Sequence, residues 1–211
     1  SLDLFAGRVE QIAQVLSAVR QTGQHVVLFG ERGVGKTSLA SLTHEFWSQA
    51  MRGSLTLFPV RYSCLPGENF GSVWTRIAEL ITDEHEKRSV ALPSGEAWNE
   101  LWEGIKDGDA NPHSIRRFLS LLGKKFIIVI DEFDQITDQE TVRDFASTIK
   151  NLSDYLVDTT LILVGVADTV DDLIEDYASV ERALIQVRMP RMSTDELMII
   201  IIPAGVKLST T

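Results

Sequence analysis

Eight residues near the N-terminus constrain the fold of this chain more than any other segment. Residues 30–37 read Gly-Glu-Arg-Gly-Val-Gly-Lys-Thr, which matches the pattern G-x-x-x-x-G-K-[ST]. The apolar run 25–29 precedes the motif, and residues 36–49 have the pattern of a helix. A strand, a glycine-rich loop and a helix in this order are typical of a phosphate-binding loop, so we expect an α/β protein.

The residue types of this loop suit an anion. Gly33 and Gly35 allow the backbone to turn its N–H groups inward, and the following helix presents its positive dipole end. Lys36 is long enough to reach β- and γ-phosphates, and the hydroxyl of Thr37 can bind Mg²⁺. The alternative, a glycine-rich turn that binds nothing, is disfavoured by the flanking strand and helix. The predicted nucleotide-binding residues here are Gly30, Glu31, Arg32, Gly33, Val34, Gly35, Lys36, Thr37 and Ser38.

A second apolar run ends in two acidic residues. Residues 126–132 read Phe-Ile-Ile-Val-Ile-Asp-Glu, and ligands of open parallel sheets bind beyond the C-terminal ends of the strands. Asp131 is therefore predicted to hold Mg²⁺ through water, and Glu132 to polarise an attacking water molecule. Asp134, a third acid nearby, is assigned a loop or capping role. The alternative is a strand that ends in solvated acids, and the phosphate loop in the same chain argues against it.

Strands and helices alternate along the chain. This alternation predicts a parallel sheet with helices on both faces. Residues 82–113 are polar, and we interpret them as an insertion that holds one short helix around Trp98 and Trp102. The expected strands are 25–29, 55–62, 126–130, 161–164 and 184–187, and the expected helices are 8–20, 36–49, 70–81, 114–122, 142–152 and a short one near 170–177.

The composition excludes several classes of protein. The chain has 20 Lys and Arg against 30 Asp and Glu, and a net charge of −10 disfavours nonspecific binding to nucleic acid. No apolar run approaches the roughly 18 residues of a membrane-spanning helix. The single cysteine, Cys64, cannot form an intrachain disulfide, which fits a reducing compartment, and we expect a cytoplasmic protein. The four histidines show no metal-ligand spacing with one another or with Cys64, so no zinc site is predicted.

Four segments together resemble the AAA+ initiator and STAND groups of P-loop ATPases. Residues 4–10, Leu-Phe-Ala-Gly-Arg-Val-Glu, are similar to the Gly-Arg box ahead of the first strand in those groups. Residues 30–37 resemble the Walker A loop, residues 127–132 a Walker B strand with its catalytic glutamate, and residues 179–197 the segment that enters the lid. The resemblance implies a three-layer αβα core with sheet order 5-1-4-3-2, and ATP or ADP with Mg²⁺ as ligands.

The resemblance also implies roles for residues outside the loop. Gly7 and Arg8 would border the adenine pocket, and Arg182 would be an arginine finger that reaches the nucleotide of a neighbouring subunit. An exposed arginine at a helix end is the alternative for Arg182. In these families strand four ends in a polar sensor. Here the nearest polar side chain is Asp168, which a phosphate would repel, so Asp168 is predicted to cap the following helix.

The predicted domain organisation is a P-loop ATPase core over residues 1–192 and the start of a truncated helical lid over residues 193–211. Residues 193–196, Ser-Thr-Asp-Glu, are a capping box that would open the lid helix. The apolar stretch 197–202 lies close to the end of the chain, and an apolar face there needs a cover. We therefore expect a fragment of a larger protein.

The function predicted from these features is an ATP-binding domain that hydrolyses ATP slowly and acts as a nucleotide-driven regulatory switch. Lys36, Glu132 and Arg182 are the predicted catalytic residues, and Thr37 and Asp131 the metal ligands. The expected partners are nucleotide, a second copy reached through Arg182 and an unidentified protein or effector domain, with no membrane and with nucleic acid only through missing regions. Two alternatives stay open: a nucleotide-binding scaffold without turnover, and the ATPase module of a DNA-associated initiator or loader.

Overall fold

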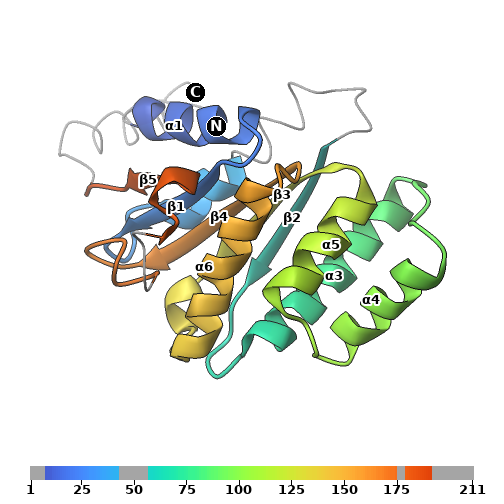
Figure 1. Ribbon diagram of the computed structural model, residues 1–211. Coiled ribbons are helices and arrows are strands. Elements are labelled where there is room, and N and C mark those ends of the chain that lie inside the picture. The colour runs from blue at the N-terminus through green and yellow to red at the C-terminus, as the bar shows by residue number, and fades with distance from the viewer. Residues whose placement is uncertain (1–7, 43–56, 175–178, 192–211) are drawn as a thin grey trace, which may run out of the picture.

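Five parallel strands form one sheet in the computed structural model, which describes residues 8–42, 57–174 and 179–191 (Figure 1). The order across the sheet is β2-β3-β4-β1-β5, which confirms the predicted order 5-1-4-3-2. Each pair of neighbouring strands is parallel, so all five strands end at the same edge of the sheet. The strands are β1 (His25–Gly30), β2 (Leu57–Ser63), β3 (Lys125–Asp131), β4 (Thr159–Val166) and β5 (Leu184–Arg188).

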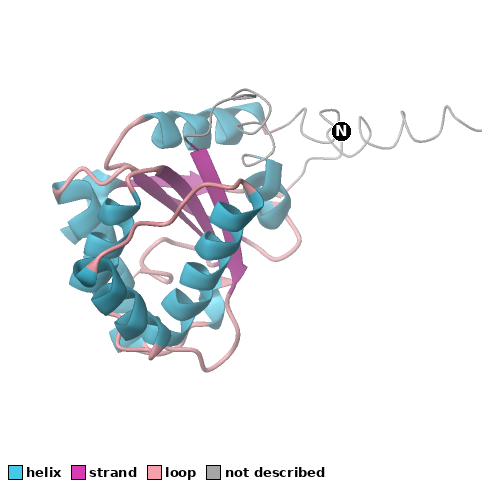
Figure 2. Cartoon of the chain, turned by 90° about the vertical axis from the view of Figure 1, so that its right-hand side faces the viewer, coloured by secondary structure: helices cyan, strands magenta, loops and turns pink. Residues whose placement is uncertain are grey.

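Helices cover both faces of this sheet and complete the predicted three layers (Figures 1 and 2). Successive strand residues alternate between the faces, so Val26 and Leu28 join one core while Val27 and Phe29 join the other. The first core includes α1 (Val9–Arg20) and the helix that begins at Lys36, whose described part ends at residue 42. The second includes α3 (Phe70–Lys87), α4 (Glu96–Lys106), α5 (Pro112–Leu122) and α6 (Gln139–Asp154). No helix among the described residues is long and apolar enough to cross a membrane.

The segment 82–113 is more helical than its composition predicts. Helix α3 continues through Lys87, because Ile81 and His85 extend its buried stripe while the polar residues between them face outward. His85 stacks on Phe58 at 4.8 Å between ring centroids. Because histidine is a polar residue type, the sequence alone does not indicate that this position is buried. Helix α4 is the short helix expected around Trp98 and Trp102.

Two other predicted elements differ from the structure. The short helix expected near 170–177 is a turn in its described part, residues 170–174, and the remaining residues lie outside the described ranges. In this turn the carboxylate of Asp172 accepts hydrogen bonds from the N–H and the hydroxyl of Thr169, both at 2.8 Å. The capping role predicted for Asp168 therefore has no helix to act on among the described residues. The predicted lid, residues 193–211, lies outside the described residues.

His25 begins β1 in the interior of the protein. Its side chain is completely buried, and its Nδ1 accepts a hydrogen bond from the backbone N–H of Leu161 on β4 at 3.1 Å. This acceptor role fixes a neutral imidazole, and burial lowers the pKa of His25 from 6.5 to about 3.

The pKa shift of His25 predicts an acid-sensitive fold. In the unfolded chain His25 binds a proton below pH 6.5, whereas in the folded chain it stays neutral down to about pH 3. The free energy of unfolding therefore rises with pH between these two values. Between pH 7 and pH 5 the free energy of unfolding should fall by about 2 kcal/mol more in the wild type than in His25→Gln, whose amide oxygen can accept from Leu161. Urea unfolding at both pH values measures this, with exposed His113→Gln as the control. Equal pH dependence in wild type and His25→Gln would contradict it.

Candidate active site

The phosphate loop, residues 30–37, joins the end of β1 to the helix that begins at Lys36. Three of its glycines have positive φ: 145° at Gly30, 82° at Gly33 and 90° at Gly35. At Gly30 there is also no room for a side chain, because a Cβ would lie 2.5 Å from the carbonyl oxygen of Met189. Glycine is therefore required at these points by backbone conformation, and at Gly30 by a close backbone approach as well.

A cavity of about 530 Å³ lies between this loop and the ends of β3 and β4. The loop and its helix line one side, and the acidic end of β3 lines the other, so the structure brings the two predicted motifs to one site. Gly165 and Val166, at the end of β4, complete the wall. The predicted residues that line the cavity are Arg32, Gly33, Gly35, Lys36, Thr37, Ser38, Asp131 and Glu132.

The remaining predicted loop residues have other contacts. Gly30 supplies a carbonyl to the side chain of Lys36, Val34 packs in the core with α1, and Glu31 pairs with Arg191 beyond the last strand. Gly7 lies outside the described residues. These residues shape the loop rather than the wall of the cavity.

Lys36 is folded back on its own loop. Its ammonium group donates hydrogen bonds to the carbonyl oxygens of Gly30 and Glu31, at 2.8 and 2.7 Å. Burial lowers the pKa of Lys36 below its usual value, and the carboxylates of Asp134 and Asp131 oppose that shift. A phosphate in the cavity would offer this buried cation a charged acceptor, which makes a stronger hydrogen bond than a carbonyl does.

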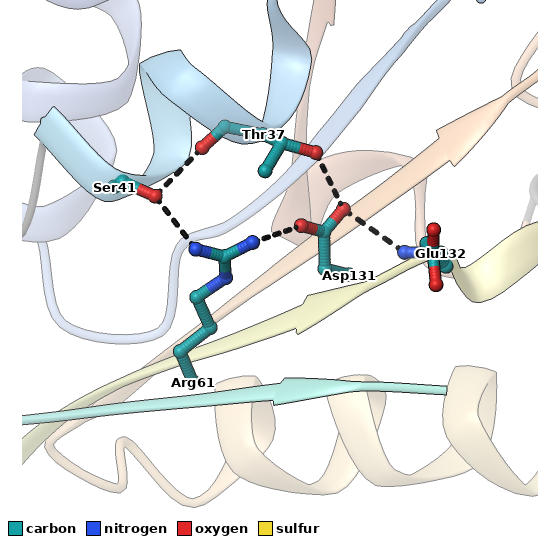
Figure 3. A network of polar contacts seen from close by, with 5 residues as sticks. All are labelled: Thr37, Ser41, Arg61, Asp131 and Glu132. Carbon is teal, nitrogen blue, oxygen red and sulfur yellow. Dashed lines mark hydrogen bonds and ion pairs between the residues drawn. The ribbon is translucent and has the colours of Figure 1, made fainter. Parts of the chain in front are cut away.

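Asp131 and Thr37 are in direct contact on the wall of the cavity. The hydroxyl of Thr37 donates to Oδ1 of Asp131 at 3.1 Å, and the backbone N–H of Glu132 donates to the same oxygen at 3.0 Å (Figure 3). A hydroxyl and a carboxylate at this separation are hard oxygen donors of the kind that Mg²⁺ accepts beside phosphate oxygens and water. No group of three or more His, Cys, Asp or Glu among the described residues could hold a metal alone. The site therefore fits a metal ion that arrives with phosphates.

Glu132 sits where the backbone leaves β3 at a sharp angle. Its φ is 54°, a left-handed conformation that is unusual for any residue but glycine, asparagine or aspartate. The short 3₁₀ helix η2 (Phe133–Gln135) follows at once. This turn places Glu132 on the wall of the cavity, exposed to solvent beside buried Asp131. A carboxylate there can accept a hydrogen bond from a water molecule that approaches a γ-phosphate.

Asp134 has a more specific role than the predicted loop or cap. Its Oδ1 accepts the backbone N–H of Val166 at 2.8 Å, and so it ties the end of β3 to the end of β4 on the cavity wall. Gln135 donates to the other oxygen of Asp134 at 3.2 Å and also lines the cavity. Sequence reasoning did not select Gln135. The described end of β4 offers Gly165 and Val166 to the cavity, which have no polar side chain for a sensor.

Arg8 is buried between the loop and the segment that leaves the sheet. Its Nη2 donates to the carbonyl oxygens of Pro190, at 2.6 Å, and of Val34, at 3.4 Å. Nearby, the N–H of Met189 donates to the carbonyl of Phe29 at 2.8 Å, and Arg191 Nε donates to Glu31 at 2.6 Å. Residues 189–191, here called the exit segment, are thus bonded to the loop and to the strand before it. The place of Arg8 beside an adenine pocket stays a prediction.

Arg182 lies far from the cavity of its own chain. It belongs to the 3₁₀ helix η4 (Glu181–Ala183), which precedes β5, and its carbonyl accepts from Gln24, just ahead of β1. Its guanidinium pairs with Asp154 at the last residue of α6. Because the strands are parallel, these contacts put Arg182 at the edge where strands begin, opposite the phosphate loop. Contact with a neighbouring subunit's nucleotide is the role that remains predicted.

Comparison with known proteins agrees with this geometry. The sequence model of the AAA ATPase domain matches residues 4–164 of the chain. The chain belongs to this family. As the sequence resemblance implies, it is a P-loop ATPase of the AAA type. The comparison with curated proteins gives no match.

Solved structures share its fold at low sequence identity. The ORC1 protein of Aeropyrum pernix, solved in complex with DNA, has a TM-score of 0.64 at 16% identity, covering 98% of this chain and 53% of that chain. The ORC2 protein of Aeropyrum pernix, solved in ADPNP–ADP complexes, has a TM-score of 0.62 at 16% identity, with 93% and 50% covered. Domain III of the replication initiation protein DnaA from Thermotoga maritima has a TM-score of 0.54 at 14% identity, with 97% and 72% covered. The AAA ATPase domain spans about half the length of the first two chains.

Proposed function

We propose that this AAA ATPase domain binds ATP with Mg²⁺, hydrolyses it slowly and acts as a nucleotide-driven regulatory switch in a larger protein. One observation carries the switch: the exit segment is bonded to the phosphate loop and to β1. Met189 bonds to Phe29, Pro190 to Arg8, and Arg191 to Glu31 within the loop itself. A loop that changes when phosphates bind therefore acts directly on the chain that continues beyond β5.

The roles proposed for Lys36, Thr37, Asp131 and Glu132 rest on their places in the cavity, and those proposed for Gly7, Arg8 and Arg182 rest on the family resemblance. The loop amides of residues 30–38 and Lys36 hold the phosphates, and the hydroxyl of Thr37 with the carboxylate of Asp131 holds the metal, which supplies charge stabilisation at the phosphates. Glu132 orients and polarises the attacking water. Gly7 and Arg8 border the adenine, and Arg182 completes a neighbour's site in a self-associated form.

The two alternatives each have one supporting observation. Binding without turnover is supported by the end of β4, where Gly165 and Val166 offer no polar sensor to the cavity. A role as the ATPase module of a DNA-associated initiator is supported by likeness to the DNA-bound ORC1 protein and to DnaA domain III. The net charge of −10 disfavours DNA binding by this domain, so in that case the contact with DNA would lie in other parts of the protein.

The switch is tested by hydrogen exchange in the presence of different nucleotides. We expect the amide of Met189 to exchange at different rates in the complexes with a non-hydrolysable ATP analogue and with ADP, by about fivefold or more, since allosteric couplings are usually about 1–3 kcal/mol. Arg191→Gln, which breaks the pair with Glu31, should reduce this difference.

The matched control is Arg76→Gln, which breaks an exposed pair with Glu79 on α3, far along the chain from the exit segment. It should leave the exchange difference unchanged. Equal exchange at Met189 in both nucleotide complexes, with both nucleotides bound, would overturn the switch and favour the scaffold.

A further inference from the structure

Arg61 is the one charged residue of β2. The residues before it on β2, 57–60, are buried, whereas the side chain of Arg61 is 43% exposed and lies level with Val129 of β3. Its guanidinium extends two residues further along β3. There Nη2 donates to Oδ2 of Asp131 at 2.7 Å, and the carboxyl side chain of Asp131 is only 4% exposed. Arg61, on the edge strand β2, therefore forms an ion pair with the buried carboxylate of Asp131.

The same guanidinium also contacts the helix that follows the phosphate loop. Nη1 donates to the hydroxyl of Ser41 at 2.9 Å, and that hydroxyl donates to the carbonyl oxygen of Thr37 at 2.8 Å (Figure 3). Since the hydroxyl of Thr37 in turn donates to Oδ1 of Asp131, the four residues form a closed ring that includes the backbone carbonyl of Thr37. Arg61 thereby fixes which oxygen of Asp131 faces Thr37.

Arg61 approaches Asp131 from outside the main cavity. It lines a separate hollow of about 240 Å³ with Ser41, Val129 and their neighbours, whereas Asp131 and Thr37 line the main cavity. The arginine can therefore remain on Oδ2 while the pocket side of Asp131 changes partners. Arg61 acts through Asp131, and it is not placed to touch a ligand in the main cavity.

The charges in the main cavity explain why the pair between Arg61 and Asp131 matters for a metal ion. Three carboxylates line it, Asp131, Glu132 and Asp134, with Arg32 and Lys36 as the cations on the wall. Carboxylates attract divalent ions, but among the described residues no group of three or more His, Cys, Asp or Glu is arranged to hold one tightly without further ligands. Arg61 compensates the one carboxylate that is proposed to hold the metal, and its own charge repels a second cation there.

We propose that Arg61 is a positioning residue that holds Asp131 toward Thr37 and supplies the positive charge at this carboxylate, so that divalent metal binds well only together with nucleotide. This inference rests on the proposed function, because it concerns the same metal-binding carboxylate. It requires that loss of Arg61 strengthens metal binding to the nucleotide-free protein, whereas loss of a purely structural residue would weaken it or leave it unchanged.

The test is titration of Mn²⁺ into the nucleotide-free chain, followed by electron paramagnetic resonance of the free ion. Arg61→Met should bind Mn²⁺ about tenfold more tightly than the wild type, the effect of removing one unit charge near a divalent ion in a largely aqueous dielectric. Arg61→Lys, which keeps the charge, should stay near the wild type. Adding Asp131→Asn to Arg61→Met should abolish the gain, because the gain runs through this carboxylate.

Lys106→Met is the control for general loss of positive charge, since Lys106 pairs with Glu103 on the surface of α4. It should bind Mn²⁺ as the wild type does. If Arg61→Met does not fold, as judged by circular dichroism, Arg61→Gln replaces it, because its amide can still donate to Asp131 without the charge. Unchanged or weaker Mn²⁺ binding in the folded neutral variant would overturn the role of Arg61. Because no nucleotide is present, this result is independent of whether the chain binds ATP, which a separate titration of the wild type decides.

Discussion

The Glu132→Gln variant should bind MgATP as tightly as the wild type and hydrolyse it at least about 100-fold more slowly, the usual contribution of a general base. Glu132 lines the cavity beside Asp131, with its side chain exposed to the solvent that fills it. The amide of glutamine has nearly the same size as the carboxylate of glutamate, but it carries no negative charge and cannot accept a proton from water. Glutamate and glutamine have a similar energetic cost in the left-handed conformation at a φ of 54°. The substitution therefore changes the chemistry of the side chain more than the conformation of the backbone.

The measurement is phosphate release under single-turnover conditions, combined with a titration of ATP into each protein. Glu100→Gln is the matched control, because it makes the same change at an exposed position on α4. It should turn over ATP at the wild-type rate. Equal turnover in wild type and Glu132→Gln would remove Glu132 from the mechanism. A wild type that binds ATP but releases no phosphate above the background without protein would instead favour the scaffold without turnover.

The Lys36→Ala variant should lose at least about 100-fold in affinity for ATP, because a buried cation that bonds to phosphate contributes about 3 kcal/mol or more through charge-assisted hydrogen bonds. Its ammonium group already lies within the loop, bonded to the carbonyls of Gly30 and Glu31. Alanine removes the charge and leaves these two carbonyls without the ammonium donor. Lys125→Ala is the matched control, since Lys125 pairs with Asp158 at the start of β3, the edge opposite the loop. It should bind ATP normally.

The sheet and the two motifs could be predicted because their signals are local in the sequence. The spacing of glycines between a strand and a helix predicts the phosphate loop, and an apolar run that ends in Asp131 and Glu132 predicts β3. The strand order was implied by family resemblance, and the sheet confirms it. The adjacency of the two motifs follows from that order, since β4 alone separates β1 from β3.

The contacts that the sequence did not reveal join residues far apart in the chain. Arg61 reaches Asp131 across 70 positions, and a single charge in the run 57–63 was the one available signal. Asp134 bonds to Val166 across 32 positions, which a reading of its immediate neighbours cannot foresee. Helix α3 was predicted too short because His85 is polar by type but buried by stacking on Phe58. Pairing across a sheet depends on register, and local composition does not encode register directly.

The most direct test of the account is isothermal titration of ATP, ADP and GTP, each with Mg²⁺, into the wild type and into Lys36→Ala. We expect ATP and ADP to bind the wild type, GTP to bind it more weakly, and Lys36→Ala to lose at least about 100-fold in affinity for ATP. Lys125→Ala should match the wild type. ATP binding that is equal in wild type and Lys36→Ala, or a folded wild type that binds none of the three nucleotides, would contradict the assignment of the cavity as a nucleotide site.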